Sequence, residues 1–288
     1  MDTQNTPIHI SLWHADFWIL AIANLLITMS VYMLIPVLPV WMFSVAGLSQ
    51  HEVGIVMGAY GIGLFVFGGF CNWYVQRYRR NRVCLWAMVG VFFALLGCWL
   101  VENEMQQSWI QYRLLLFLRI VLGAAFGLVQ MVLSSTLIID KSESFQRTEA
   151  NHASAWFGRF ALSLGPMLGI VFARTTFSPL LASSILALAA FILLAMVKFP
   201  FRTPEDGVKR FSGDRFFLPE AKWLFVNLFL ICLSVGLLMS TQFTAMFYAM
   251  VMVGFCVALL AERFAFVDAD LRSQVVAGSI LIAIALVM

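Results

Sequence analysis

The chain has 288 residues, of which 62% are hydrophobic and 11% charged, whereas a typical soluble domain has about 25% charged residues. A soluble fold of this size could not bury so much apolar surface, so a soluble protein is excluded and the surplus is expected to face lipid. The formal net charge of +3 is small, and the distribution of the charges is therefore more informative than their sum.

Apolar segments long enough to cross a bilayer follow one another along the whole chain, since a spanning helix takes about 20 residues. The predicted bounds are 16–43, 53–75, 83–101, 112–138, 155–173, 179–198, 223–240, 243–262 and 274–288. Helices are expected because these runs lack the polar–apolar alternation of membrane-barrel strands. The sequence therefore predicts an all-α polytopic membrane protein with about nine transmembrane helices.

The Lys and Arg residues are strongly biased to one side of this predicted topology. With the N-terminus in the cytoplasm, 14 of the 18 fall in cytoplasmic links and 2 in external links. The bias predicts a cytoplasmic N-terminus. If the protein is bacterial, a location in the plasma (inner) membrane is expected. The longest polar link, 199–222, is predicted to separate a six-helix bundle (1–198) from a partial bundle of about three helices (223–288).

The first predicted helix has a polar stripe. Asn24, Thr28 and Tyr32 recur at four-residue spacing and so share one face of the helix. Gln130 is a similar isolated polar residue in the fourth helix. These side chains could line a cavity, or they could form hydrogen bonds between helices.

The link between the second and third helices is basic, with Gln76, Arg77, Arg80 and Arg82 among its residues. Positive charge on the cytoplasmic side would by itself account for most of this pattern. The alternative is a gate at the cytoplasmic face.

Arg119 is the most informative residue, because it lies inside the fourth apolar segment. Arginine at the centre of a membrane helix costs about 2.5–3.5 kcal/mol and is usually functional or paired. Gly123, one turn further, favours close contact with another helix. The alternative is that Arg119 extends its guanidinium to the outer interface.

The fifth helix combines Gly158 and Arg159 with Gly165, Pro166 and Gly169. Proline removes a backbone donor, and the glycines let a neighbouring helix approach, so a hinge or a static packing kink is expected here. Arg159 is either a second intramembrane charge on an ion or ligand path, or a residue near the cytoplasmic end.

These motifs resemble those of the major facilitator superfamily. Arg119-x-x-x-Gly123-x-x-x-Gly127 is similar to the helix 4 motif of its proton-coupled members, and Gly158 with Gly165-Pro166-x-x-Gly169 is similar to the helix 5 motif of its antiporters. The link from Gln76 to Arg82 resembles a degraded form of the loop between helices 2 and 3, where the family usually has Asp in place of Gln76 and Gly in place of Arg79. The resemblance implies two six-helix bundles around a central cavity, alternating access, and a chain that lacks its last three helices.

Other classes of function have little support in the sequence. The five cysteines form no CxxC pair and the four histidines have no ligand-like spacing, so no metal site and no cofactor are expected. We find no P-loop, GxSxG or HExxH motif, which argues against an enzyme. The basic links are explained by topology and do not indicate nucleic-acid binding.

The leading hypothesis is therefore a secondary transporter of small molecules, with export coupled to a proton gradient and Arg119 acting in the coupling. Asp and Glu residues lie only at the ends of the predicted helices, so no protonating acid is identified. A nutrient uptake symporter is the second hypothesis. The third is a truncated chain that does not transport, or one that associates with a partner chain or with itself in the bilayer.

Overall fold

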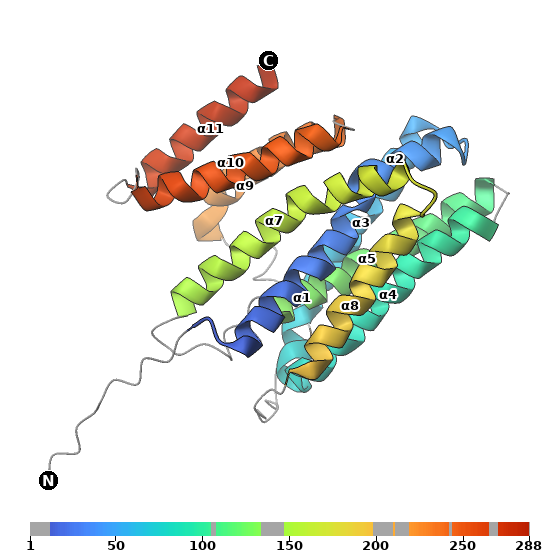
Figure 1. The fold of residues 1–288 in the computed structure, drawn as a ribbon, viewed down its shortest axis with the longest axis horizontal. Helices are drawn as coiled ribbons and strands as arrows, with labels where there is room; N and C mark the ends of the chain where they lie inside the picture. Colours follow the sequence, from blue (N-terminus) through green and yellow to red (C-terminus); the bar gives the residue numbers. More distant parts are fainter. Residues whose placement is uncertain are drawn as a thin grey trace, which may run out of the picture.

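The computed structural model describes residues 12–104, 108–133, 147–197, 210, 219–241, 244–264 and 270–287, and all regular elements in these ranges are helices. They are α1 (Ala15–Tyr32), α2 (Leu34–Ser44), α3 (Gln50–Arg77), α4 (Arg80–Glu104), α5 (Ser108–Val132), α7 (Arg147–Ala173), α8 (Pro179–Met196), the short 3₁₀ helix η4 (Pro219–Ala221), α9 (Lys222–Thr241), α10 (Ala245–Phe264) and α11 (Leu271–Val287). Figure 1 shows α1 to α8 as one bundle of roughly parallel and antiparallel helices, with α10 and α11 along one side of it.

The nine predicted segments all contain helix, but several boundaries differ. The first segment is two helices, because the helical pattern is interrupted at Met33 between α1 and α2. Pro36 lies in the first turn of α2, where a missing backbone donor is tolerated, whereas Pro39 lies inside the helix. The last part of the predicted fourth segment, residues 134–138, lies outside the described residues.

Three helices are longer than predicted at their polar ends. α3 continues to Arg77 and α4 begins at Arg80, so only Tyr78 and Arg79 separate them. α7 begins at Arg147 rather than at residue 155. Hydropathy underestimates these ends because a helix can extend beyond the hydrocarbon with charged residues on its last turns.

Local sequence explains where other helices start. Ser49 caps α3 in a capping box: its hydroxyl accepts from the Glu52 backbone N–H at 3.3 Å, and the Glu52 carboxylate accepts from the Ser49 N–H at 2.8 Å. Pro179 is the first residue of α8, where its fixed φ suits a helix start.

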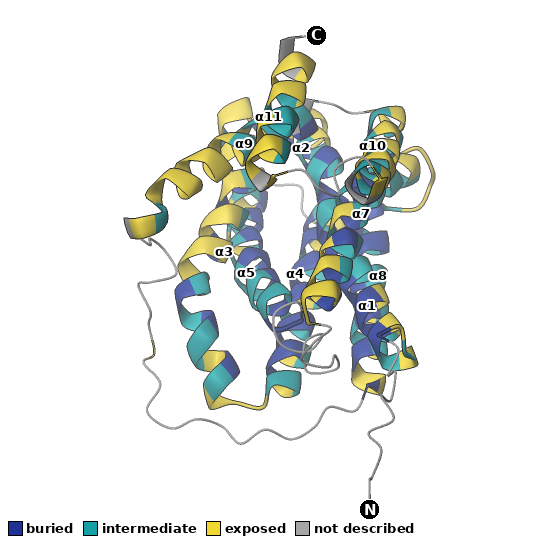
Figure 2. Ribbon diagram, turned by 90° about the vertical axis from the view of Figure 1, so that its left-hand side faces the viewer, coloured by how far each residue is buried: buried dark blue, intermediate teal, exposed yellow. Residues whose placement is uncertain are grey.

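The buried core runs through the first bundle. α1 lies between α7 and α8, and α5 packs against α3 and α4. Fully buried side chains such as Phe17, Ile27, Met88 and Leu122 fill the space between these helices. In Figure 2 this core is dark blue, whereas α9, α10 and α11 are mostly exposed.

A second, smaller apolar cluster joins the C-terminal helices to the bundle. Ile170 of α7, Met239 of α9 and Tyr248 of α10 are buried together. The Ser163 hydroxyl on α7 donates to the backbone carbonyl of Tyr248, and the Tyr248 hydroxyl donates to the carbonyl of Met239 at 2.8 Å. α10 therefore contacts the first bundle mainly through α7, and α9 also packs against α2.

Among the described residues, seven helical stretches are long and apolar enough to cross a membrane: Ala15–Ser44, Gln50–Arg77, Arg80–Glu104, Trp109–Val132, Arg147–Ala173, Pro179–Met196 and Lys222–Met239. α10 and α11 contribute the shorter apolar stretches Ala245–Ala261 and Arg272–Ala285. Large apolar side chains such as Trp86 and Phe93 are more than half exposed on the outer faces of these helices. This surface is what a helix facing lipid requires.

Candidate functional site

A cluster of four polar side chains joins three helices inside the bundle. The side-chain amide of Gln130 on α5 donates to the Thr28 hydroxyl at 2.8 Å and to the side-chain oxygen Oδ1 of Asn24 at 3.2 Å. Both acceptors are on α1. The Thr28 hydroxyl donates to the same Asn24 oxygen at 3.5 Å, and the Asn24 amide donates to the Ser154 hydroxyl on α7 at 3.4 Å. Asn24, Thr28 and Ser154 are at most 3% exposed. We call these four residues the polar cluster.

The polar cluster contains three residues that the sequence singled out separately. Four-residue spacing placed Asn24 and Thr28 on one face of α1, and the structure brings Gln130 to that face. Buried amides and hydroxyls need hydrogen-bond partners in an apolar bundle, and here they supply them to one another. Ser154 was not predicted, because a single serine in a helix carries no signal in the sequence.

Tyr32, the third member of the predicted stripe, belongs to an aromatic row. Its ring centroid lies 6.2 Å from that of Phe126 on α5, and Phe126 lies 6.2 Å from Tyr60 on α3. The guanidinium of Arg119 lies 4.9 Å from the centroid of Tyr60. The row Tyr32–Phe126–Tyr60 therefore connects α1, next to the polar cluster, with Arg119.

Arg119 is 3% exposed. Its Nη2 lies 3.7 Å from the Met57 sulfur, a weak acceptor, and its guanidinium faces the Tyr60 ring. Within the described residues, Nε and Nη1 have no hydrogen-bond partner. The guanidinium thus lies among side chains of neighbouring helices instead of extending into the surroundings of the bundle, and most of its hydrogen-bonding capacity is unused.

At Gly123, α5 lies directly against the backbone of α3. A Cβ atom there would overlap the carbonyl oxygen of Tyr60 and lie 2.9 Å from the backbone nitrogen of Leu64. Gly63 on α3 has the same relation to Ile120 on α5, whose carbonyl oxygen a Cβ would overlap. This reciprocal contact holds Arg119 against Met57 and Tyr60.

The glycines of α7 have two different environments. A Cβ at Gly165 would lie 2.9 Å from the Met29 carbonyl oxygen, and one at Gly169 would lie 2.7 Å from the Met33 carbonyl oxygen. These two glycines therefore allow α7 to pack directly on the backbone of α1 and of Met33, the residue that follows it. Gly158, by contrast, has open space around it. Pro166 lies inside α7, which continues as one helix through it.

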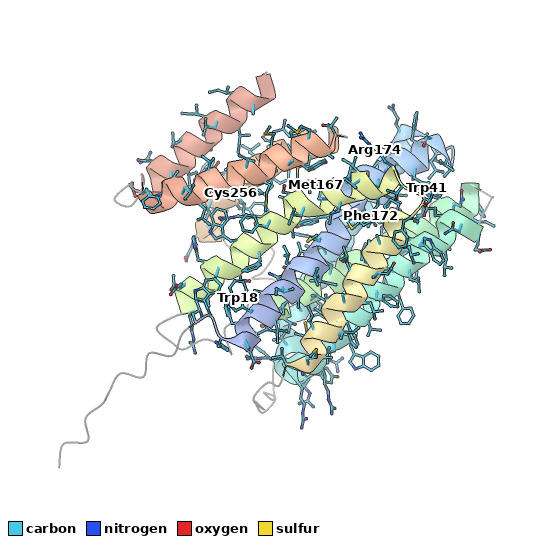
Figure 3. The ribbon with its side chains drawn as sticks, viewed as in Figure 1. Trp18, Trp41, Met167, Phe172, Arg174 and Cys256 are labelled. Atoms are coloured by element: carbon cyan, nitrogen blue, oxygen red, sulfur yellow. The ribbon has the colours of Figure 1, made fainter. Side chains whose placement is uncertain are left out.

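Arg159 does not join Arg119. It is exposed on α7, and its guanidinium lies 4.7 Å from the centroid of the Trp156 ring. Two residues earlier, on the other side of α7, Phe157 packs edge-on against Trp18 of α1, with the ring centroids 6.1 Å apart. Trp18 lies at the lower end of the bundle in Figure 3.

The basic residues between the second and third segments lie on helix ends. Gln76 and Arg77 are in the last turn of α3, and Arg80 and Arg82 are in the first turn of α4. Arg77 and Arg82 are exposed, and Gln76 and Arg80 are half-buried. The structure does not bring these residues to the polar cluster or to Arg119, and their role as a gate stays a prediction.

Besides Ser154, sequence reasoning missed three side chains that the structure places at notable positions. Met57 and Tyr60 form the surroundings of Arg119, and Glu102 is half-buried near the end of α4. Glu102 Oε2 accepts a hydrogen bond from the Ser178 hydroxyl at 2.7 Å. The predicted third helix ended at residue 101, so Glu102 was assigned to a link.

No group of three or more His, Cys, Asp or Glu residues suited to a metal ion occurs in the described part of the chain. The cysteines are free, with Cys71, Cys84 and Cys98 buried and Cys232 and Cys256 exposed.

Comparison with known proteins agrees with this architecture. Residues 20–288 match the family model of the Major Facilitator Superfamily. The xylose transporter XylE from E. coli, solved in an inward-open conformation, has a similar fold, with a TM-score of 0.51 and 19% sequence identity. The match covers 64% of this chain and 47% of XylE, so this chain spans about half the length of that transporter. No curated protein matches the chain.

Proposed function

The chain belongs to the major facilitator superfamily, and we propose that it is a secondary active transporter that exports small molecules in exchange for protons by alternating access. Its many apolar helices make it a multi-pass membrane protein. The lipid bilayer would surround the exposed apolar faces. The N-terminus would be cytoplasmic, since this places most Lys and Arg residues inside.

The observation that carries the proposal is the buried and incompletely bonded Arg119. A buried cation without an anionic partner is costly, and such residues inside membrane helices are found where they serve a function. A fixed positive charge also lowers the pKa of an acid that approaches it, and this would make proton release depend on the position of α5.

The polar cluster supports a substrate site in the same bundle. Asn24 and Gln130 carry amides that donate and accept hydrogen bonds, and Thr28 and Ser154 carry hydroxyls. A polar substrate could replace the hydrogen bonds that these residues make to one another, without exposing an unpaired group. Tyr32 would line the path at the end of the aromatic row.

The glycines of α7 would serve the movement of the helix. Gly165 and Gly169 lie on the backbone of α1, and Pro166 between them removes one helical hydrogen bond. A helix with this composition can bend or slide where it touches its neighbour. Gly158 and Arg159, at the exposed part of α7, would follow this motion.

Dye efflux tests the proposal. Cells that make the protein are loaded with a fluorescent dye, and its retention is measured with and without a protonophore. The expected result is lower retention in producing cells, abolished by the protonophore and by Arg119→Gln. Arg113→Gln is the matched control, because Arg113 is on the same helix but exposed. Equal retention in producing and empty cells would contradict the proposal.

Uptake of a neutral polar nutrient is the second candidate. The observation that favours it is the polar cluster, because uncharged amides and hydroxyls suit a hydroxylated substrate. XylE, which is similar in fold, is a transporter of xylose. Transport measured separately in inside-out and right-side-out vesicles distinguishes uptake from export.

A chain that acts only with a partner, or with a second copy of itself, is the third candidate. α3 has a face on which a Cβ atom added at Gly54, Gly58 or Gly61 would meet no described atom within 4 Å. Such a face can accept another helix closely. Cross-linking in native membranes, followed by measurement of the mass of the product, tests this candidate.

A further inference from the structure

We propose that a pocket near the C-terminal end of α4 binds a compact organic amine with one positive charge and an apolar body. The pocket lies between α2, α4, α7 and α8, and its volume is about 360 Å³. It occupies the end of the bundle opposite the Arg77–Arg82 link, because α3 begins and α4 ends at that side. It shares no residue with the polar cluster or with the surroundings of Arg119.

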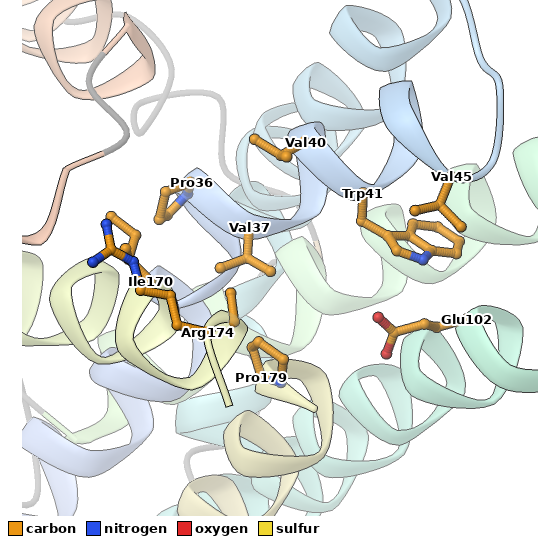
Figure 4. A pocket seen from close by; sticks show the side chains of 10 residues that line it. Pro36, Val37, Val40, Trp41, Val45, Glu102, Ile170, Arg174 and Pro179 are labelled. Carbon is orange, nitrogen blue, oxygen red and sulfur yellow. The ribbon is translucent and has the colours of Figure 1, made fainter. Parts of the chain in front are cut away.

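The size and lining of the pocket suit an apolar molecule. Ligand pockets range from about 300 to 1,000 Å³, so this pocket is at the small end of the range. Its wall consists largely of aliphatic and aromatic side chains, among them Val37, Trp41, Ile170 and Pro179. Figure 4 shows these side chains around a space between the helix ends.

Glu102 supplies the negative charge. The Ser178 hydroxyl donates a hydrogen bond to Oε2 of Glu102 at 2.7 Å. No described residue donates a hydrogen bond to Oε1. The carboxylate is half-buried on the pocket wall, and Figure 4 shows it on the same side as the Trp41 ring. A half-buried carboxylate with a free oxygen next to an indole attracts an ammonium group, through a charge-assisted hydrogen bond and a cation–π contact.

Arg174 determines the number of charges that the ligand can carry. It lines the same pocket, and Figure 4 shows it at the side away from Glu102 and Trp41. A single ammonium group directed at Glu102 keeps its distance from the guanidinium. A second ammonium group at the other end of the ligand would face Arg174 and be repelled. The pocket should therefore prefer monoamines to diamines of the same length.

The position of the pocket distinguishes it from the proposed transport site. Its wall includes Val37 and Ile170, which flank the contact between Gly169 of α7 and the backbone of Met33. An occupant would touch both α2 and α7 directly. It would contact none of the four residues of the polar cluster, so substitutions in the cluster should leave its affinity unchanged.

Binding of tritium-labelled 2-phenylethylamine to the purified full chain in detergent tests the proposal. We expect saturable binding that excess unlabelled amine displaces and that neutral 2-phenylethanol does not. Glu102→Gln, which keeps the acceptor for Ser178 but removes the charge, should weaken binding roughly tenfold or more. Glu104→Gln is the matched control, because Glu104 is exposed near the same helix end, and it should change the affinity less than twofold.

Two further measurements make the assignment specific. Arg174→Gln should leave 2-phenylethylamine binding intact and raise the affinity for p-xylylenediamine. Gln130→Leu should not affect the binding of either amine. Equal affinity of Glu102→Gln and the unaltered chain, or equal displacement by amine and alcohol, would overturn the proposal. Size-exclusion profiles identical to that of the unaltered chain ensure that each variant is folded.

Discussion

Replacement of Arg119 by methionine should make the protein more stable and abolish transport. The guanidinium is 3% exposed, and in the described residues Nε and Nη1 have no partner. Arginine at the centre of a membrane helix costs about 2.5–3.5 kcal/mol. The cation–π contact of the guanidinium with the Tyr60 ring offsets about 0.5–2 kcal/mol of this cost. Arg119→Met should therefore raise the free energy of unfolding by about 1–3 kcal/mol, since methionine fills a similar volume.

Thermal unfolding in detergent measures this change. The buried Cys84 and Cys98 become reactive only when the bundle opens, so a thiol-reactive fluorophore follows the transition. A gain of about 1–3 kcal/mol corresponds to an increase in Tm of several degrees for a chain of this size. The control is Arg113→Met: Arg113 is exposed and its guanidinium lies 3.6 Å from the centroid of the Trp109 ring. Its loss should lower Tm slightly.

A fall in Tm of several degrees in Arg119→Met would refute this reasoning. Removing one member of a buried, well-paired ion pair costs about 3–5 kcal/mol, so such a fall would mean that Arg119 has a stabilising partner. Unchanged transport in the same variant would separately contradict the proposed role of Arg119 in coupling. The two readouts are independent, since a stabilised protein that has lost activity remains folded.

Three further predictions concern packing, the polar cluster and the thiols. Gly123→Ala should destabilise the chain by about 1–3 kcal/mol because its Cβ would overlap the Tyr60 carbonyl oxygen, whereas Gly58→Ala, in open space, should be neutral or stabilising in the same Tm assay. Gln130→Leu should cost about 1–3 kcal/mol, because it leaves buried polar groups without their donor, and should reduce substrate affinity measured in vesicles. In the detergent-solubilised folded chain, a maleimide should label the exposed Cys256 faster than the buried Cys98, as mass spectrometry would show.

The helices of the first bundle could be predicted from the sequence because their apolar runs are long. The ends of these helices could not be predicted in the same way. Charged residues such as Arg77, Arg80 and Arg147 lower the local hydropathy, yet they lie within helices. Hydropathy indicates which residues can lie in the hydrocarbon of the bilayer, whereas a helix ends where its backbone hydrogen bonds end.

Part of the candidate site could be predicted from the sequence. The part that could not be predicted depends on contacts between residues far apart in the chain. Helical spacing places Asn24, Thr28 and Tyr32 on one face, but no pattern in a single sequence shows that Gln130 reaches Asn24 across 106 residues. The same limit explains why Tyr60 and Ser154 were missed. Arg119 was identified because an arginine inside a long apolar run can be recognised from the local sequence alone.

Among the packed helix pairs of the first bundle, α3–α5 and α1–α7 share one feature, which is a close approach of the two helix backbones. Backbone lies directly on backbone in each pair, at Gly63 and Gly123 in the first and at Gly165 and Gly169 in the second. The polar cluster and the aromatic row join the two pairs through side chains.

Side-chain hydrogen bonds can be exchanged for bonds to a substrate, whereas the glycine contacts cannot open without leaving voids. We therefore expect rearrangement within the bundle to separate one pair from the other. Gln130 and Arg119 would then move together, because they lie on one face of α5, which is continuous from Ser108 to Val132. A substrate that replaces the Gln130–Thr28 hydrogen bond would in this way displace the guanidinium from Tyr60. Substrate binding would thereby be linked to the buried charge without direct contact between them.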